Sequence, residues 1–185
     1  DIDGEAAQDL SGSSVSLSSD GSIVSIGASF NDGNGDNSGH VRVYQVDLNS
    51  INLTSQSISA SELISLDSQY SGTVNASSVN TITGTAAEIN TVYASSGISG
   101  LGNEAITITA PLTVAQFNTL AAQTTGVITA TISDGDIATL AGLTETGHAL
   151  TISVTDASVA ASALNTLDSK TTVAVNASAV TTITG

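Results

Sequence analysis

The chain has 185 residues, of which 40% are hydrophobic and only 10% are charged. Two Lys and Arg residues stand against 17 Asp and Glu residues, so the net charge at pH 7 is −15. This balance argues against binding to nucleic acid or to an anionic membrane surface, because both need clusters of cationic side chains.

Residues 1–47 predict a small antiparallel β-meander. Three short runs alternate between apolar and polar residues, at positions 14–18, 23–28 and 40–45. A turn and a loop, both rich in Gly, Asp and Asn, join the runs. Alternation with a period of two and connections of this composition are typical of consecutive antiparallel strands.

The loop at residues 32–39 (DGNGDNSG) is the best candidate for a metal site. It places oxygen-bearing side chains at alternate positions, and the glycines between them allow a tight turn around one cation. Hard cations such as Ca²⁺ take oxygen ligands of this kind. The same composition also forms ordinary hairpin turns that bind no metal, so both interpretations stay open.

Residues 1–45 resemble one blade of the FG-GAP type, the repeat of integrin-like β-propellers. The segment Ile26-Gly27-Ala28-Ser29 stands where the family has its Gly-Ala-Pro, with Ser29 as a departure. In particular, the segment resembles the version repeated in large surface proteins of marine cyanobacteria. The resemblance implies a calcium loop in which Asp32, Asn34 and Asp36 are the Ca²⁺ ligands.

Residues 48–58 predict a polar connector or an entering strand, and residues 59–185 alternate short β runs with short helical runs. The predicted strands are 73–74, 105–109, 127–132, 149–154 and 172–175. Each strand is followed by apolar residues three positions apart, the spacing of a helix that lays one stripe on a core. These spacings are Val79/Ile82, Val114/Phe117/Leu120, Ile137/Leu140, Leu164/Leu167 and Val180/Ile183.

Capping boxes mark the predicted helix starts. In this motif a Ser or Thr caps the helix and a Glu or Gln three residues later bonds back to it. The matches are Ser59-x-x-Glu62, Thr85-x-x-Glu88, Thr113-x-x-Gln116 and a shorter version, Ser133-x-x-Asp136. The second box predicts an extra helix over Ala86–Ala94.

The strand spacing predicts the fold class, which is α/β. Ile108, Ala130, Ile152 and Val173 fall at matching positions, with steps of 22, 22 and 21 residues. A strand and a short helix in about 22 residues is the unit of a leucine-rich-repeat-like solenoid, and strands joined through helices pair in parallel. We therefore predict a parallel β-strand and short-helix solenoid over residues 59–185, with an all-β helix as the nearest rival. The residues expected in its core are Leu66, Ile108, Leu120, Ile132, Leu140, Ile152, Leu167 and Val175.

An internal repeat supports this stacked architecture. Residues 60–84 return as residues 161–185 without a gap, and 15 of the 25 aligned positions are identical. These segments, with the run at 96–109, resemble repeats of giant surface proteins of marine picocyanobacteria. The phrase Ala-Glu-Ile-Asn at 87–90 also resembles repeats of phage tail-fibre proteins.

A second candidate surface is a row of threonines on the predicted strands. Because alternate residues of a strand project to one side, we expect these side chains to share one face. Such a face offers hydroxyls to ordered water or to sugars, although Thr is also an ordinary exposed strand residue. The residues concerned are Thr107, Thr109, Thr129, Thr131 and Thr151.

These patterns predict a segment of a large, secreted, repetitive protein of a bacterial cell surface, structural or adhesive and not enzymatic. We expect a fragment of a longer protein whose partners are neighbouring repeats, surface glycans or other surface proteins, with calcium as the cofactor. No apolar run approaches the roughly 18 residues that span a bilayer. The alternatives are a glycan- or ice-binding module on the threonine face, or a phage tail-fibre repeat, which would trimerise.

Overall fold

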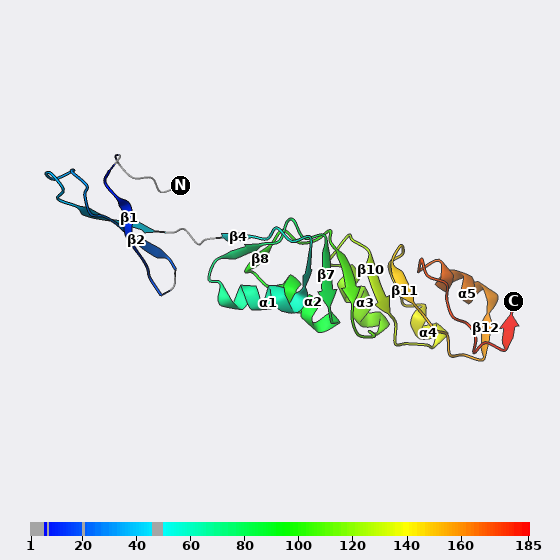
Figure 1. Ribbon diagram of the computed structural model, residues 1–185. Helices are drawn as coiled ribbons and strands as arrows, with labels where there is room; N and C mark the ends of the chain where they lie inside the picture. Colours follow the sequence, from blue (N-terminus) through cyan, green and yellow to red (C-terminus); the bar gives the residue numbers. More distant parts are fainter. Residues whose placement is uncertain (1–5, 7, 20, 46–49) are drawn as a thin grey trace. The chain divides into compact units, whose positions relative to one another are not determined.

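The computed structural model describes residue 6 and residues 8–19, 21–45 and 50–185. The chain divides into two compact units, residues 1–49 and 50–185, called here the N-terminal and the C-terminal unit. Figure 1 shows strands β1–β3 in the first unit and all described helices in the second. The described chain is thus a mixed α/β protein with one antiparallel sheet and several parallel sheets.

The N-terminal unit is a three-stranded antiparallel sheet in the order β1-β2-β3, which confirms the predicted meander. Its strands are β1 (Ser11–Leu17), β2 (Ile23–Ala28) and β3 (His40–Gln45). Most of their apolar side chains are exposed, Leu17 by 63% and Val43 by 66%. The hydrogen-bonded ladder therefore contributes more to this unit than a packed core does.

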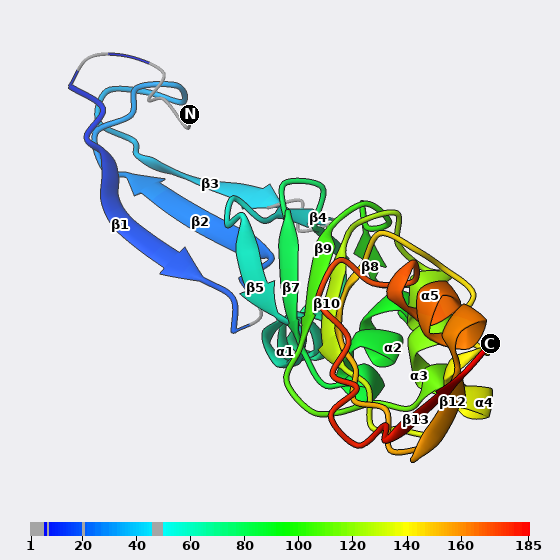
Figure 2. The ribbon, with the colours of Figure 1, turned by 90° about the vertical axis from the view of Figure 1, so that its right-hand side faces the viewer.

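The main sheet of the C-terminal unit has five parallel strands in the order β11-β10-β9-β7-β5. They are β5 (Ser57–Ser59), β7 (Thr81–Gly84), β9 (Ala105–Ile108), β10 (Ile128–Thr131) and β11 (Ala149–Thr151). Each strand lies beside the next one along the chain in this sheet. This confirms the parallel pairing predicted from the helical connections (Figure 2).

Two smaller sheets complete the unit, and both are also parallel. One has the order β4-β6-β8, with β4 (Ser50–Asn52), β6 (Thr73–Asn75) and β8 (Ile98–Ser99). The other pairs β12 (Ser158–Ala160) with β13 (Thr182–Thr184). The segment predicted as a connector or entering strand therefore contains β4 and most of β5.

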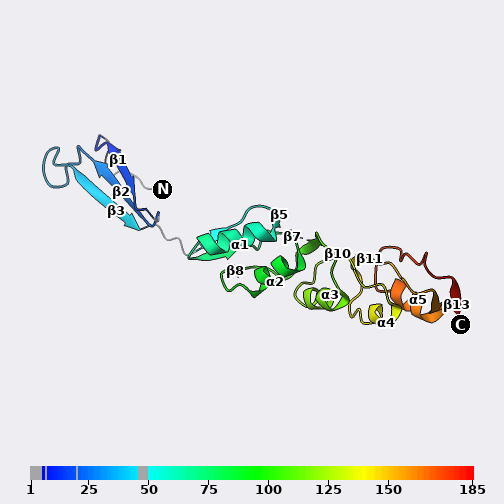
Figure 3. The same ribbon diagram turned by 90° about the horizontal axis from the view of Figure 1, so that it is seen from below.

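Five described helices connect these strands and follow one another along the unit (Figure 3). They are α1 (Ala60–Gln69), α2 (Ala86–Ala94), α3 (Val114–Ala121), α4 (Ile137–Leu140) and α5 (Ala161–Asp168). The capping boxes predicted at Ser59, Thr85 and Thr113 are all formed. The fourth prediction is wrong, because Asp136 itself is the N-cap of α4 and accepts the Thr139 N–H.

The core of the C-terminal unit lies between strands and helices and is made of small aliphatic side chains around Phe117. Five of the eight residues predicted in the core are buried: Leu120, Ile132, Leu140, Ile152 and Leu167. Leu66, Ile108 and Val175 are only partly buried, which corrects the prediction. Leu66 lies in the first strand-and-helix repeat of the C-terminal unit and Val175 in the last. Among the described residues, each of these repeats has a neighbouring repeat on one side only. Ile108 lies at the end of β9 opposite Gly84, which has no side chain to cover it.

Two of the predicted helices are strands. The Val79/Ile82 spacing lies on the approach to β7, and the Val180/Ile183 spacing lies on the approach to β13. In both places the sequence Thr-Ile-Thr-Gly alternates polar and apolar residues, which favours a strand. Val79 instead closes a turn, since its N–H donates to the Ala76 carbonyl at 2.9 Å.

The strand register also differs in part from the predicted steps. Ile106 pairs with Ile128, a step of 22 residues as predicted, but Ala130 pairs with Leu150 and not with Ile152. A shift of two residues keeps every side chain on its predicted face. The run at 172–175 forms no extended strand and pairs only through isolated bridges on either side of it.

Candidate functional site

The base of the candidate calcium loop is closed by a buried polar pair in the N-terminal unit. Asn31 and Asp9 are 4% and 5% exposed, and Nδ2 of Asn31 donates to Oδ2 of Asp9 at 2.9 Å. Asn31 also accepts the Gly33 N–H on its side chain and the Gly39 N–H on its carbonyl, each at 2.9 Å. Both ends of the loop are therefore fixed to one buried asparagine.

The three candidate calcium ligands, Asp32, Asn34 and Asp36, lie on the exposed part of this loop. Oδ1 of Asp32 accepts the Asn37 N–H at 2.6 Å, so one carboxylate oxygen already stabilises the turn. Gly35 and Asn37 have positive φ angles of 133° and 53°, which allow the tight reversal. Across the part of the chain that the structure describes, no three His, Cys, Asp or Glu side chains gather as a metal cluster.

The threonine face is formed by adjacent strands of the main sheet. Thr83, Thr107 and Thr129 are direct neighbours across β7, β9 and β10, and we call them the threonine row. Thr131 and Thr151 form a second neighbouring pair across β10 and β11. Thr109 follows β9 and is exposed, as are Thr129, Thr131 and Thr151, whereas Thr107 is half-buried.

Sequence reasoning missed Thr83, because it placed this residue in a helix. The signal was present in the alternation Thr81-Ile82-Thr83, in which Ile82 is fully buried and the threonines on either side are half-buried. The row is thus longer than predicted and begins one strand earlier.

His148 is a buried titratable group immediately before β11 of the main sheet. It is 8% exposed, and its Nδ1 accepts the Ile128 N–H at 3.1 Å. Phe117 contacts the imidazole edge to face, with ring centroids 5.3 Å apart. Burial lowers the pKa of His148, and the negative charge of Glu145 opposes this shift. The neutral imidazole is therefore a structural acceptor between two strands.

A second buried network lies at the loop between α2 and β9. Glu104 is 1% exposed and accepts the Tyr93 hydroxyl as well as the N–H groups of Gly102 (2.8 Å) and Asn103 (3.1 Å). Burial, together with the Glu104 carboxylate, raises the pKa of Tyr93. All these partners stabilise the loop, and the carboxylate is enclosed by them.

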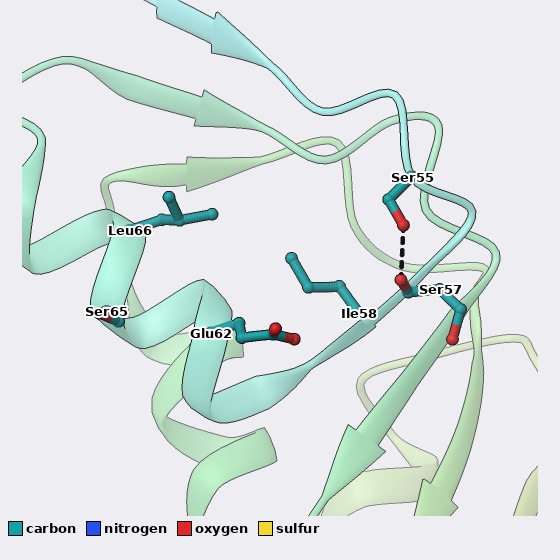
Figure 4. A pocket seen from close by; sticks show the side chains of 6 residues that line it. All are labelled: Ser55, Ser57, Ile58, Glu62, Ser65 and Leu66. Atoms are coloured by element: carbon teal, nitrogen blue, oxygen red, sulfur yellow. Dashed lines mark hydrogen bonds between the residues drawn. The ribbon is translucent and has the colours of Figure 1, made fainter.

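A shallow groove lies between β5 and α1 (Figure 4). Ile58 and Leu66 form its apolar wall, and Glu62 and Ser65 lie along its helical side. The Ser55 hydroxyl donates to the Ser57 carbonyl at 2.6 Å and fixes the adjoining turn. Because Glu62 already forms the capping box with Ser59, its carboxylate serves the helix terminus.

The sequence matches no protein-family model, and no curated protein or solved structure shows significant similarity to it. Within the described residues, no helix has both the length and the apolar character needed to cross a membrane.

Proposed function

We propose that this chain is a non-enzymatic segment of a large, secreted, repetitive cell-surface protein with a structural or adhesive role. The main support is the recurrence of one strand-and-helix arrangement at both ends of the C-terminal unit. The β5–β7 pair and the β12–β13 pair have the same parallel register, offset throughout by 101 residues. Modules that repeat in this way stack into extended scaffolds with large surfaces for contacts.

We further propose that the C-terminal unit is a solenoid similar to leucine-rich repeats. Carboxylates that bridge consecutive strand-and-helix units support this proposal. Oδ2 of Asp134 accepts the Val114 N–H at 2.7 Å, and Oδ2 of Asp156 accepts the Ile137 N–H at 2.8 Å. Each carboxylate thus caps the helix of the unit before its own, where the helix dipole favours a negative charge.

The surface assignment is tested by locating the protein on the cells that produce it. Antibodies against the recombinant chain should label intact cells, and protease added outside should remove the label. On an immunoblot the antigen should be far larger than the 18.2 kDa of this chain. Label that appears only after the cells are opened, or an antigen of the chain's own mass, would contradict the proposal.

Calcium binding by the loop at 32–39 is part of this proposal, with Asp32, Asn34 and Asp36 as ligands. The support is that the loop is fixed at its base by Asn31 and that its three oxygen-bearing candidate side chains are exposed. Calcium should then raise the melting temperature of the N-terminal unit, because a ligand that binds only the folded state stabilises it. Asp36→Ala should lose most of this gain, whereas Asp20→Ala, outside residues 32–39, should keep it.

Calorimetry with millimolar calcium, with and without chelator, measures this difference. The gain should persist in moderate sodium chloride, since direct coordination is not screened like a diffuse acidic surface. Equal calcium shifts in the wild type and in Asp36→Ala would show that the loop is only a turn.

One observation favours a second function, a ligand-binding module for glycans or ice. The threonine row places hydroxyl-bearing side chains side by side on three consecutive strands. If this face binds, Thr107→Val together with Thr129→Val should abolish glycan-array or ice-recrystallisation signals without changing the fold. Binding that survives both substitutions would eliminate the row as the site.

A further inference from the structure

The internal repeat allows the two ends of the C-terminal unit to be compared residue by residue. Residues 57–84 are the first copy and residues 158–185 the second, and residues 101 positions apart are called twins. The turn that precedes the last strand is closed identically, since Asn80 N–H donates to Gln56 and Thr181 N–H donates to Ala157, each at 2.8 Å. The strand pairing and this turn are therefore the same in both copies, whereas β6 of the first copy has only an isolated bridge at the twin positions 174–176.

Burial of the twins differs sharply on one side of the fold. Ile82 is fully buried in β7, whereas its twin Ile183 in β13 is 64% exposed. The same holds for three further apolar pairs, in which the first member is at most 3% exposed and the second is half-buried. These pairs are Leu63/Leu164, Val74/Val175 and Val79/Val180. We call the second members, with Ile183, the C-terminal face.

Residues 85–108 cover the corresponding face of the first copy. There β9 pairs with β7, with Ile106 opposite Ile82, and β8 pairs with β6, with Ile98 opposite Val74. The intervening helix α2 packs on α1, and Ser95 of the same segment donates to Asp67 at 2.7 Å. The first copy thus shows what kind of element buries this surface.

Polar groups of the C-terminal face lack the partners that their twins have. In the first copy, the N–H groups of Val74 and Ala76 donate to Gly97 and Ser99, each at 2.8 Å. No hydrogen bond is formed by the twin N–H groups of Val175 and Ala177 within the described part of the chain. These unpaired donors mark an open sheet edge that can accept another strand.

The charge of the second copy agrees with a surface that becomes covered. In a chain with a net charge of −15, residues 161–185 contain one carboxylate, Asp168, and one ammonium group, Lys170. Sheet edges that stay in water are usually protected by charged residues or proline. β13 has neither, and its sequence is Thr-Ile-Thr.

The opposite side of the two copies shows that the neighbour decides the burial. Leu66 in the first copy is half-buried at the groove of Figure 4, whereas its twin Leu167 is 3% exposed. Leu167 lines one small cavity together with Ile137 and Leu140 of the preceding helix α4, which packs beside α5. The same leucine position is therefore covered wherever a strand-and-helix unit stands beside it.

We propose that the C-terminal face binds one further strand-and-helix unit of the same repeat type, with the pattern of residues 85–108. This inference rests on the proposed scaffold function and specifies the kind of partner that covers the C-terminal face. The incoming unit supplies a capped helix against α5 and a parallel strand on β13, with an apolar residue opposite Ile183. It also supplies carbonyl groups for Val175 and Ala177 and a hydroxyl for Asp168.

The chain provides its own probe for this proposal. Gly185 is the twin of Gly84, so residues 85–121 can be appended directly after Gly185 in the full chain. Hydrogen exchange measured by mass spectrometry should then slow on the order of tenfold or more over residues 171–184, because the opening of this edge becomes linked to the core. A matched control appends the same residues with Ile106→Lys, which should remove the protection.

Ile183→Lys gives the decisive comparison. In the unextended chain it should leave the melting temperature nearly unchanged, because the side chain is exposed, and in the extended chain it should lower the melting temperature by several degrees. Unchanged exchange over 171–184 on extension, or equal effects of Ile183→Lys in both chains, would overturn the proposal. Concentration-dependent association of the unextended chain, abolished by Ile183→Lys, would assign the face to a second copy and would also overturn it. None of these results depends on where the protein resides, so cell-surface labelling can fail or succeed independently.

Discussion

The two units of this chain are stabilised in different ways. In the N-terminal unit most strand side chains are exposed, and one buried polar pair, Asp9 and Asn31, closes the long loop. In the C-terminal unit a continuous aliphatic core runs under successive strands, and hydrogen bonds to side chains lie mainly at helix starts and turns. A single polar contact therefore matters most in the first unit, and a single apolar contact in the second.

The difference follows from how many layers each unit has. A three-stranded sheet alone covers little apolar surface and is marginal in water. Parallel strands with helices packed against them bury one face completely, as Ile82, Ile106 and Ile128 show with 0% exposure each. Substitutions that remove one contact in either unit test this difference directly.

The largest effect is expected from Leu140→Ala in the core of the C-terminal unit. Leu140 is fully buried on α4, a helix too short to be stable alone. Loss of its side chain should lower the free energy of unfolding by about 2–5 kcal/mol, from lost burial and the cavity left behind. Denaturant titration measures this change, and a loss no larger than that of an exposed threonine would refute the assignment of α4 to the core.

A smaller effect, confined to the other unit, is expected from Asp9→Ala. This substitution removes the carboxylate that accepts from the buried Asn31 amide and should cost about 1–3 kcal/mol. Hydrogen exchange should accelerate in residues 31–45 and remain unchanged beyond residue 50. Asp32→Ala is the matched control, since Asp32 is exposed and its carboxylate accepts the Asn37 N–H. Faster exchange in both units would show that they do not respond separately.

The third prediction concerns the pH dependence of the C-terminal unit. Because burial lowers the pKa of His148, the unfolded chain binds a proton more readily than the folded one. The contribution of neutral His148 to stability is therefore fully present above the ordinary histidine pKa near 6.5, and this contribution is lost as the pH falls below that value. Protonation also turns Nδ1 into a donor that faces the Ile128 N–H, which removes a bond typically worth about 0.5–1.5 kcal/mol.

Thermal melts at pH 7.5 and 5.0 measure this dependence. His148→Gln keeps a side-chain acceptor but does not titrate, so its melting temperature should fall less than that of the wild type. His40→Gln in β3 controls for histidine loss in the other unit. A wild-type pH dependence that His148→Gln leaves intact would assign the effect to other groups.

The smallest effect is expected from Thr129→Ala. Thr129 is exposed at the end of the threonine row, so its replacement should change the free energy of unfolding by less than about 0.5 kcal/mol. The same denaturant titration as for Leu140→Ala measures this value. A loss of several times that size would mean that the threonine face is covered in the folded protein.

Local signals in the sequence predicted a large part of the C-terminal unit. The capping boxes at Ser59, Thr85 and Thr113 depend on residues three positions apart, and all of them are formed. The helix Ala86–Ala94 has the predicted bounds. The three antiparallel strands of the N-terminal unit were likewise predicted from alternation over a few residues. The physical reason is that caps and alternation involve neighbours along the chain.

The candidate sites were only partly predictable. The loop at 32–39 was identified by composition, but the closure of its base by Asp9 depends on a contact across 22 positions. The threonine row was predicted from strand spacing, yet Thr83 was missed because β7 looked like a helix of two turns. Two apolar residues three positions apart fit a short helix as well as a short strand. The pairing of β7 with β5 and β9 decides that this segment is a strand.

Only the tertiary structure decided the contacts between successive strand-and-helix repeats of the C-terminal unit. Asp134 caps α3 and Asp156 caps α4 across about one repeat, and His148 accepts an N–H from a strand 20 positions earlier. The sequence by itself determined where α1, α2 and α3 begin and that one segment recurs after 101 residues. It did not determine which twin is buried, because Ile82 and Ile183 have the same local sequence. Burial depends on whether a neighbouring unit removes the side chain from water, which local sequence cannot encode.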